Sequence, residues 1–197
     1  MATKAFAAAT MILALSTGHP RAHSPETPSN VRSLNAHVKA ALSDGLRRSA
    51  IVRELVASID VAGVVVYLEE GPCAEGVGCT MLVPSPGSIR LLRVNFVLRT
   101  PDGATPLLCR RERLIAQIGH ELQHVAEIAA DASVSDEESL SDLFRRIGHQ
   151  RGHAQAFETD RAQRTSQLIL EELRTTTPRT RRPASSPARG TYDEPSR

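Results

Sequence analysis

The stretch LIAQIGHELQHVAEIA, residues 114–129, contains two histidines four residues apart, His120 and His124, and Glu121 directly follows the first of them. Residues with this spacing lie above one another on one face of a helix, so the two imidazoles should point the same way. At about 100° per residue, the apolar side chains fall on the opposite side of the helix; they are Ile118, Leu122, Val125 and Ala129. We therefore predict a long helix over about residues 108–130, with one packed face and one face, carrying the histidines, that looks into a cleft.

The pattern His-Glu-x-x-His on a helix is typical of zinc-dependent hydrolases. His120 and His124 would each give one nitrogen to a zinc ion, which lowers the pKa of a bound water molecule. Glu121 would take the proton from that zinc-activated water and so act as the general base. The alternative interpretation is a solvated histidine pair on an ordinary helix.

A catalytic zinc usually has three protein ligands, so the chain should supply a third. An extended pattern with a third histidine is excluded, because Glu127 and Ala130 stand where it needs glycine and histidine. A later segment predicts a last helix from Phe157 to about Leu173, with Glu158 near the centre of its apolar face. Burying a carboxylate alone is costly, so a metal ion is its expected partner. We predict Glu158 as the third ligand, with a solvated helix-start glutamate as the alternative.

Several other side chains are candidates for supporting roles. Glu127 lies on the histidine face and is predicted to orient His124, with a solvated glutamate as the alternative. Asp160 would support the site or serve as a helix-start charge. Tyr67 is a possible hydrogen-bond donor to an oxyanion. Two loop histidines could replace the carboxylate ligand or donate to the oxyanion: His149 and His153.

The first residues, 1–22, have the features of a secretory signal peptide. Lys4 precedes an apolar run over 5–15, and small residues follow, with cleavage expected after Gly18 or after Ala22. The run is too short to span a bilayer, so we expect no stable membrane insertion after cleavage. The alternative is a buried N-terminal helix. The protein is therefore expected to be secreted or periplasmic, in a bacterium.

The remaining chain divides into a flexible leader over 23–30, a single α+β domain over 31–174 and a disordered basic tail over 175–197. The tail is rich in Pro, Ser and Arg and cannot bury a core. Aromatic residues make up 3% of the chain and its net charge is +2, so nucleic acid is not an expected partner.

Within the domain, periodicity and turn residues predict the secondary structure. Asn30 is a possible helix cap, and Ser43–Gly45 should break the helix that follows. Strand 89–98 alternates between apolar and polar side chains, which indicates one buried and one wet face. The expected elements are helices over 31–42, 46–59, 108–130, 139–148 and 157–173, and strands over 61–71, from about 80, and over 89–98.

The three cysteines do not determine their own pairing. Cys73 and Cys79 lie in the glycine-rich loop GPCAEGVGC and could close a small disulfide in an oxidising compartment, which would leave Cys109 over. A zinc site that uses Cys73 and Cys79 is disfavoured, because their spacing is longer than usual for zinc ligands.

The stretch at 114–129, followed by FETD at 157–160, resembles the zincin metalloprotease superfamily and most closely its gluzincin branch, whose third ligand is a glutamate. It is also similar to small exported bacterial proteins with HELQH and a downstream FETD. The resemblance covers about residues 45–174. It implies a small twisted sheet, antiparallel or mixed, with an active-site helix and a second helix that bears a ligand.

By this resemblance, His120, His124 and Glu158 are zinc ligands and Glu121 is the general base. It also implies an edge strand, for which Ile89–Leu98 is the candidate, that aligns an extended peptide. The sequence departs from the thermolysin pattern four residues after the third ligand, where Ala162 replaces an aspartate.

Three hypotheses of different classes follow from these patterns. The first is an exported zinc metallopeptidase that acts on a peptide or protein substrate. The second is a non-catalytic, zinc-stabilised secreted binding protein that uses the same ligands. The third is a helical interaction domain in which the motif is accidental.

Overall fold

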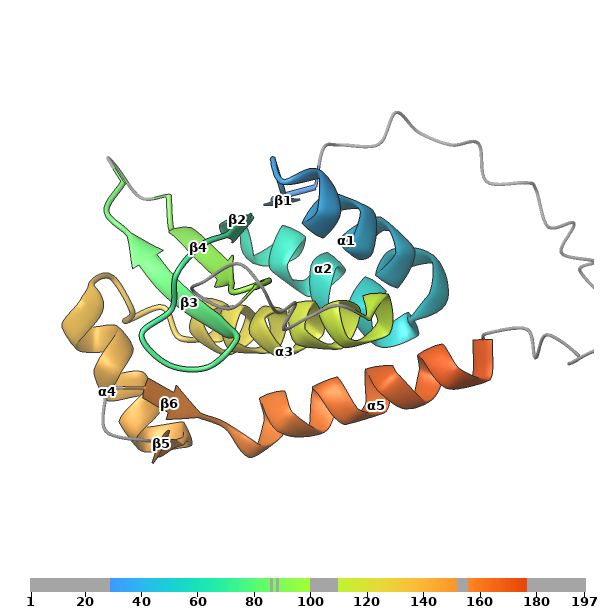
Figure 1. The fold of residues 1–197 in the computed structure, drawn as a ribbon. Coiled ribbons are helices and arrows are strands. Elements are labelled where there is room, and N and C mark those ends of the chain that lie inside the picture. Colours follow the sequence, from blue (N-terminus) through green and yellow to red (C-terminus); the bar gives the residue numbers. More distant parts are fainter. Residues whose placement is uncertain (1–28, 86, 88, 100–109, 152–155, 177–197) are drawn as a thin grey trace, which may run out of the picture.

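The computed structural model describes residues 29–85, 87, 89–99, 110–151 and 156–176. Helices and strands are mixed in it, which confirms the α+β class (Figure 1). The predicted signal peptide, most of the leader and nearly all of the tail lie outside the described residues, as do His153 and Cys109. The helices are α1 Ala36–Arg48, α2 Ala50–Ala62, α3 Arg111–Ala130, α4 Glu137–Ile147 and α5 Asp160–Thr176, and the strands are β1 Val31–Arg32, β2 Val65–Glu70, β3 Gly78–Val83, β4 Leu91–Phe96, β5 His149–Arg151 and β6 Ala156–Glu158.

The main sheet has the strand order β1-β2-β4-β3, with parallel pairing of β2 to β1 and to β4 and antiparallel pairing of β3 to β4. Strand 89–98, expected at the edge, is therefore central, and β3 is the edge strand. The edge position was an implication of the zincin resemblance. The separately predicted wet face is present at Arg93, which is exposed. Asn95 on the same face is buried, because its side-chain amide donates to the Pro72 carbonyl at 3.0 Å.

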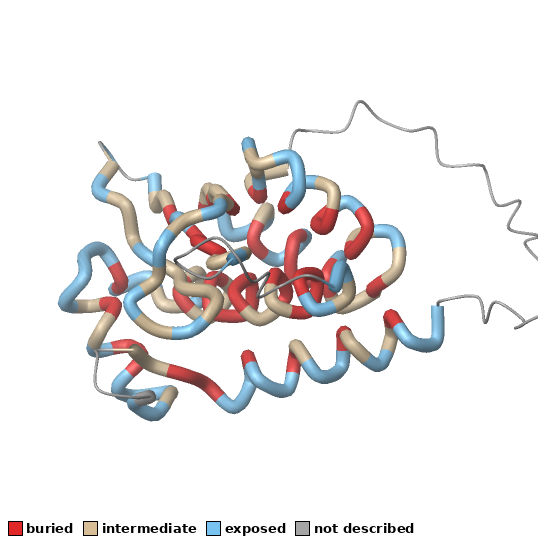
Figure 2. The backbone as a smooth tube through the Cα atoms, viewed as in Figure 1, coloured by how far each residue is buried: buried red, intermediate tan, exposed pale blue. Residues whose placement is uncertain are grey.

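Helix α3 lies at the centre of the molecule, in contact with α1, α2, β3 and α5 (Figure 1). The predicted packed face is confirmed, since Ile118, Leu122 and Val125 are fully buried. The opposite face was expected to look into a cleft, and His120 and His124 do line a pocket, although His124 is only 6% exposed. Most of α3 is buried or half-buried (Figure 2). No helix among the described residues is long and apolar enough to cross a membrane.

The close approach of α5 to α3 depends on Gly119. A Cβ atom added there would lie 2.0 Å from Cδ1 of Ile169, which is fully buried. Glycine therefore opens a slot in α3 that the isoleucine of α5 fills. This packing places α5 directly beside the turn of α3 that carries His120.

The first described residues differ from the prediction of a helix over 31–42, because a short strand, β1, precedes α1. Val31 pairs with Val66 in parallel β strands, and the backbone N–H of Asn30 donates to Asp60 Oδ1 at 2.7 Å. The last residue of the predicted leader is thus held against α2. The N-cap of α1 is Asn35 instead, whose side-chain oxygen accepts from the backbone N–H groups of the first turn.

The predicted helix break at Ser43–Gly45 is also displaced. Helix α1 continues through it, because a Cβ at Gly45 would lie 3.0 Å from Ile115 Cγ2 and the glycine lets α1 approach α3. The break falls at Ser49, whose hydroxyl accepts from Val52 N at 3.1 Å and caps α2. Helix α2 then ends at Gly63, which has a φ of 68°, so β2 begins later than predicted.

The last helix begins three residues later than the predicted start at Phe157. Residues 156–158 form β6, in which Glu158 pairs with His149 of β5, and α5 begins only at Asp160. The hydroxyl of Thr159 accepts from Ala162 N at 3.1 Å, as a helix-capping residue does. The predicted ligand therefore stands at the end of a strand, and the expected second ligand-bearing helix is a strand–helix junction.

Arg90 provides a test of how α3 is held in place. Its guanidinium donates to the carbonyls of Ile128, Ala129 and Asp131 at 2.9–3.0 Å, at the C-terminal end of α3. Replacing it with alanine removes these charged donors, so we expect Arg90→Ala to lower the free energy of unfolding by about 2 kcal/mol. Urea denaturation measures this change. The exposed Arg93→Ala is the control and should change stability by less than about 0.5 kcal/mol; equal losses in both variants would contradict the capping role.

Candidate metal centre

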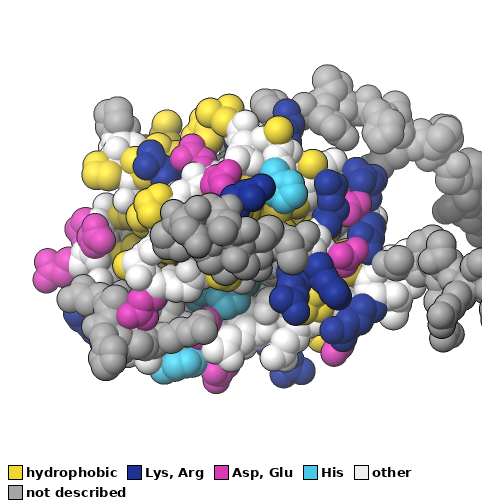
Figure 3. All heavy atoms as spheres, in the orientation of Figure 1, with side chains coloured by type: hydrophobic (Ala, Val, Ile, Leu, Met, Phe, Trp, Pro, Cys, Tyr) yellow, Lys and Arg dark blue, Asp and Glu magenta, His cyan; other side chains and the backbone are white. Residues whose placement is uncertain are grey.

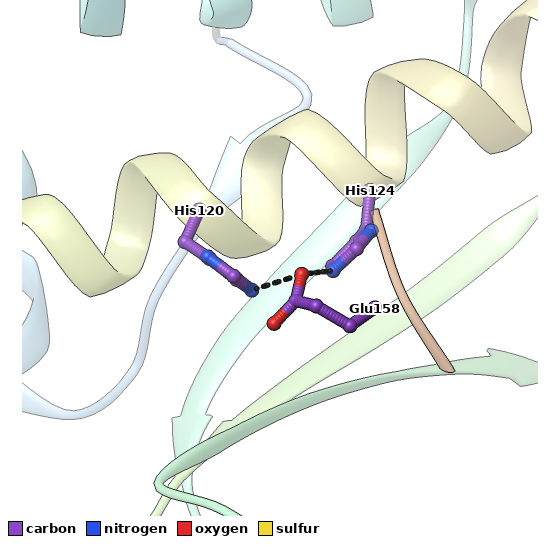
Figure 4. A group of neighbouring side chains, drawn as sticks. All are labelled: His120, His124 and Glu158. Atoms are coloured by element: carbon purple, nitrogen blue, oxygen red, sulfur yellow. Dashed lines mark ion pairs between the residues drawn. The ribbon is translucent and has the colours of Figure 1, made fainter. Parts of the chain in front are cut away.

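Three side chains from two distant segments meet beside α3 (Figure 4). His120 and His124 project from neighbouring turns of the helix, and Glu158 reaches them from the end of β6. Its Oε1 atom lies 3.4 Å from His120 Nε2 and 3.6 Å from His124 Nε2. One ligand atom from each of the three residues lies within 4.8 Å of the others, so the group could hold a metal ion.

The donor set fits zinc. Two imidazole nitrogens and one carboxylate oxygen are common ligands of a catalytic zinc, which leaves a fourth position for water or substrate. The three side chains are 12%, 8% and 4% exposed for His120, His124 and Glu158, respectively. A buried carboxylate needs a cationic partner, and a metal ion at this position would supply one.

Without a metal ion, the buried Glu158 carboxylate is balanced by a proton on a histidine. Burial alone lowers the pKa of His124, but hydrogen bonds with Glu127 and Glu158 and the nearby charge of Glu121 raise it from 6.5 to about 9. Burial alone raises the pKa of Glu158, but the hydrogen bond with His124 and the charge of His120 hold it below its usual range. In the metal-free protein, a proton on His124 thus balances the buried carboxylate.

Glu127 makes the contact that its predicted orienting role requires. Its Oε2 atom lies 3.2 Å from Nδ1 of His124, so Nε2 is the nitrogen turned toward Glu158. Thr159 donates its hydroxyl to Glu127 Oε1 at 3.1 Å, and the amide of Gln123 donates to the same oxygen at 3.3 Å. Carboxylate partners of this kind fix the orientation of a metal-binding imidazole.

Thr159 and Gln123 were not predicted from the sequence, and neither was Thr165, whose hydroxyl donates to Gln123 Oε1 at 3.3 Å. Gln123 was open to detection, because it stands one turn before Glu127 and such pairs meet on a helix surface. The two threonines lie in a segment interpreted as the interior of a helix. Only the strand–helix junction turns Thr159 toward α3.

Glu121 is 2% exposed, and both oxygens of its carboxylate accept hydrogen bonds. Gln117 donates to Oε1 at 2.8 Å from the preceding turn of α3. Thr80 donates to Oε2 at 3.0 Å from the edge strand β3. Neither partner was identified from the sequence. Gln117 was open to detection, because it stands one turn before Glu121 on the same helix, whereas Thr80 is 41 residues away along the chain.

A pocket of about 630 Å³ opens over these groups. One wall is β3 with the loop before it, and the other walls are α4 and β6. No Lys or Arg lines it among the described residues. Many of those side chains lie at the other end of the molecule, including the last turns of α1 and α5 (Figure 3). Its lining comprises residues 74–81, Gln117, His120, Glu121, His124, Glu137, Leu140, Ser141, Phe144 and residues 156–158.

Three candidates from the sequence lie away from this pocket. The side chain of Asp160 is 99% exposed, since it begins α5 on the solvent side, and that of His149 is 55% exposed with its Nδ1 4.0 Å from Asp160 Oδ1. Tyr67 is on β2, two strands from the edge that lines the pocket. The structure therefore does not support a role at the site for His149 or Tyr67. Asp160 takes the alternative that was predicted for it, a charge in the first turn of α5.

Cys73 and Cys79 form a disulfide, with Cα atoms 5.8 Å apart. The pairing that the sequence left open is thus resolved for these two residues, and they are not metal ligands. The bridge closes the loop whose residues line the pocket wall before β3.

No protein-family model, no curated protein and no solved structure matched this chain. The site is interpreted from its own geometry.

The ligand assignment predicts which substitutions remove zinc. His120→Ala and Glu158→Gln should each weaken zinc binding by more than about 100-fold, the upper end of what an outer partner such as Glu127 contributes. Competition with a chromophoric chelator measures the affinity. His149→Ala is the control, because that side chain lies outside the pocket; a loss as large as that in His120→Ala would contradict the assignment.

The metal-free protein should lose stability toward alkaline pH. The pKa of His124 is about 9 in the folded protein against 6.5, so its proton stabilises the fold below pH 6.5 and is lost as the pH rises through 9. We expect the free energy of unfolding to fall by about 3 kcal/mol over that interval. Denaturation in excess chelator measures it, and His124→Asn should flatten the dependence. An unchanged slope in that variant would assign the proton to another group.

Proposed function

We propose that the chain is an exported zinc metallopeptidase. The observation that carries this proposal is the meeting of His120, His124 and Glu158 within 4.8 Å, with Glu121 on the wall of the same pocket. The group contains the usual donor atoms of a hydrolytic zinc site, and the adjacent carboxylate is the type of residue that serves as its base.

A zinc ion, when bound, would supply the Lewis acidity that makes water nucleophilic near neutral pH. The chain's own contribution is to place and hold protons. Glu121 accepts a proton from the attacking water at a carboxylate oxygen and returns it to the leaving amine. His124 is held by Glu127 with its Nδ1 occupied, so Nε2 is the atom left for the metal.

The shape of the pocket supports a peptide as the substrate. Strand β3 is the last in its sheet, and its residues 78–81 line the pocket. An edge strand presents unpaired backbone groups that can hydrogen-bond an extended peptide. We therefore assign to β3 the aligning role first expected of strand 89–98. Leu140, Phe144 and Phe157 provide an apolar surface across the pocket for side chains of that peptide.

Export is supported by two separate features. Residues 1–22 have the composition of a secretory signal peptide. The Cys73–Cys79 disulfide is of the kind that persists in oxidising compartments such as the periplasm or the extracellular medium.

One observation favours a second candidate function, a zinc-stabilised binding protein without catalysis. Both oxygens of Glu121 are already engaged, by Gln117 and Thr80, and the residue is 2% exposed. A carboxylate has about four lone-pair sites, so two hydrogen bonds still leave room for a water molecule. We therefore favour the peptidase, and the two functions differ in a measurable way.

Replacing the base tests the proposal. Glu121→Gln should retain stoichiometric zinc and lose peptide hydrolysis by about 100-fold or more, because the amide cannot accept the proton. Zinc content and cleavage of a broad peptide library by the purified protein are the measurements. Glu112→Gln, on the same helix but outside the pocket, is the matched control.

Each other outcome has a distinct meaning. Cleavage by Glu121→Gln at the wild-type rate would show that another group is the base. Loss of thermal stability on chelation without cleavage of any peptide by the wild type would favour the binding protein. Absence of stoichiometric zinc would contradict both.

A further inference from the structure

We propose that Thr80 and Gly78 of β3 are positioning residues for the carboxylate of Glu121, so that the edge strand sets the location of the base. The inference rests on the proposed function, because it concerns the base of that reaction. Helix α3 supplies the Glu121 backbone, but one carboxylate oxygen is held from the helix by Gln117 and the other from the strand by Thr80.

The hydrogen bond from Thr80 joins a half-buried donor to the buried carboxylate of Glu121. Its Oγ1 atom lies 3.0 Å from Glu121 Oε2, and Thr80 is half-buried in the pocket wall. A hydrogen bond to a charged acceptor contributes more than a neutral one. A glutamate side chain has three rotatable bonds, and a donor on each side removes most of its freedom.

Gly78 contributes by providing space. A Cβ atom built there would lie 2.4 Å from Glu121 Oε1 and 2.8 Å from Gln117 Nε2, closer than carbon atoms approach such groups. The backbone of Gly78 is an ordinary strand, so its conformation does not require glycine. The absent side chain is what allows Glu121 and Gln117 to pack flat against β3.

Strand β3 is itself held in place by its pairing with β4 and by a disulfide. Thr80 pairs with Val94 and Gly78 pairs with Phe96 of β4, and these two partners are fully buried. Residues two apart on a strand point to the same face, so Gly78 and Thr80 meet α3 together. Between them, Cys79 is tied to Cys73 by the disulfide. A base held by this strand keeps its place relative to a peptide that pairs with the same strand.

The test uses a probe that needs no turnover. Acetohydroxamic acid chelates zinc through its two oxygens, and a carboxylate beside the zinc, which here would be Glu121, can hydrogen-bond the bound group. Calorimetric titration of the zinc-loaded full-length protein measures its affinity. Thr80→Val removes the donor and retains the shape, so we expect about tenfold weaker probe binding or more. Zinc affinity itself should stay within about twofold, because the ligands do not contact Thr80.

Four further variants give the comparison its scale. Glu121→Gln sets the loss expected when the carboxylate is absent. Thr80→Ser keeps the hydroxyl and should bind the probe like the wild type. Gly78→Ala displaces the carboxylate by a different route and should weaken binding even with Thr80 intact. Thr175→Val makes the same change in α5 away from the pocket and should have no effect.

The outcomes separate this inference from the proposed function. If wild type binds zinc and the probe, and Glu121→Gln weakens the probe, unchanged binding in Thr80→Val and Gly78→Ala overturns the positioning role alone. If a cleaved peptide is found, Thr80→Val should lower kcat more than it changes KM, since the base acts in the transition state. Failure of the wild type to bind zinc or the probe overturns the proposed function and this inference with it.

Discussion

The contact of the Glu158 carboxylate with the imidazoles of His120 and His124 is the constraint around which the rest of the structure is arranged. All three groups are largely removed from water, and an isolated carboxylate there would be strongly unfavourable. The neighbouring segments therefore supply either a counter-charge or a hydrogen bond. Glu158 Oε1 also accepts from the backbone N–H of Thr159 at 2.9 Å, so the chain itself turns to satisfy it.

This requirement extends into the next layer of the structure. Glu127 is needed on the outer nitrogen of His124, and a second buried carboxylate then needs its own donors, Thr159 and Gln123. Among the described residues, no buried side-chain polar atom lacks a hydrogen-bond partner. The buried polar side chains of α3 therefore all have hydrogen-bond partners. A fully hydrogen-bonded network makes a site rigid, whereas a partly bonded one would destabilise it. Because Thr159 follows Glu158 directly, one junction between β6 and α5 serves both layers.

The sequence predicted the parts of the site that depend on short-range periodicity. His120, Glu121, His124 and Glu127 lie on one helix, and helical spacing suffices to place them relative to one another. Glu158 was predicted from the chemical need for a carboxylate ligand. The local structure predicted for Glu158 was wrong. Phe157 continues the apolar pattern of α5 toward the N-terminus, so β6 looked like the start of the helix, and only its pairing with β5 defines it as a strand.

Contacts between distant segments could not be predicted in the same way. Thr80 meets Glu121 only because β3 pairs antiparallel with β4 and so becomes the edge beside α3. The alternation in strand 89–98 indicated one buried face but carried no information about its neighbours in the sheet. Asn95 likewise belongs to the polar side of that pattern and is buried by a hydrogen bond to a loop. Periodicity describes one element, whereas sheet order is decided by which elements pack together.

The candidate site has two supports that share only α3. His120, His124 and Glu158 are brought together by α3 and the junction at Glu158, whereas the carboxylate of Glu121 is held between α3 and β3. Cys79 lies between Gly78 and Thr80, and its disulfide to Cys73 closes the loop that leads into the strand. The bridge therefore restrains the strand that holds Glu121 but not the junction that carries Glu158. In a chain whose cysteines are still reduced, we expect His120, His124 and Glu158 to stay together while Glu121 is held less firmly, because the two parts of the proposed active site depend on different restraints.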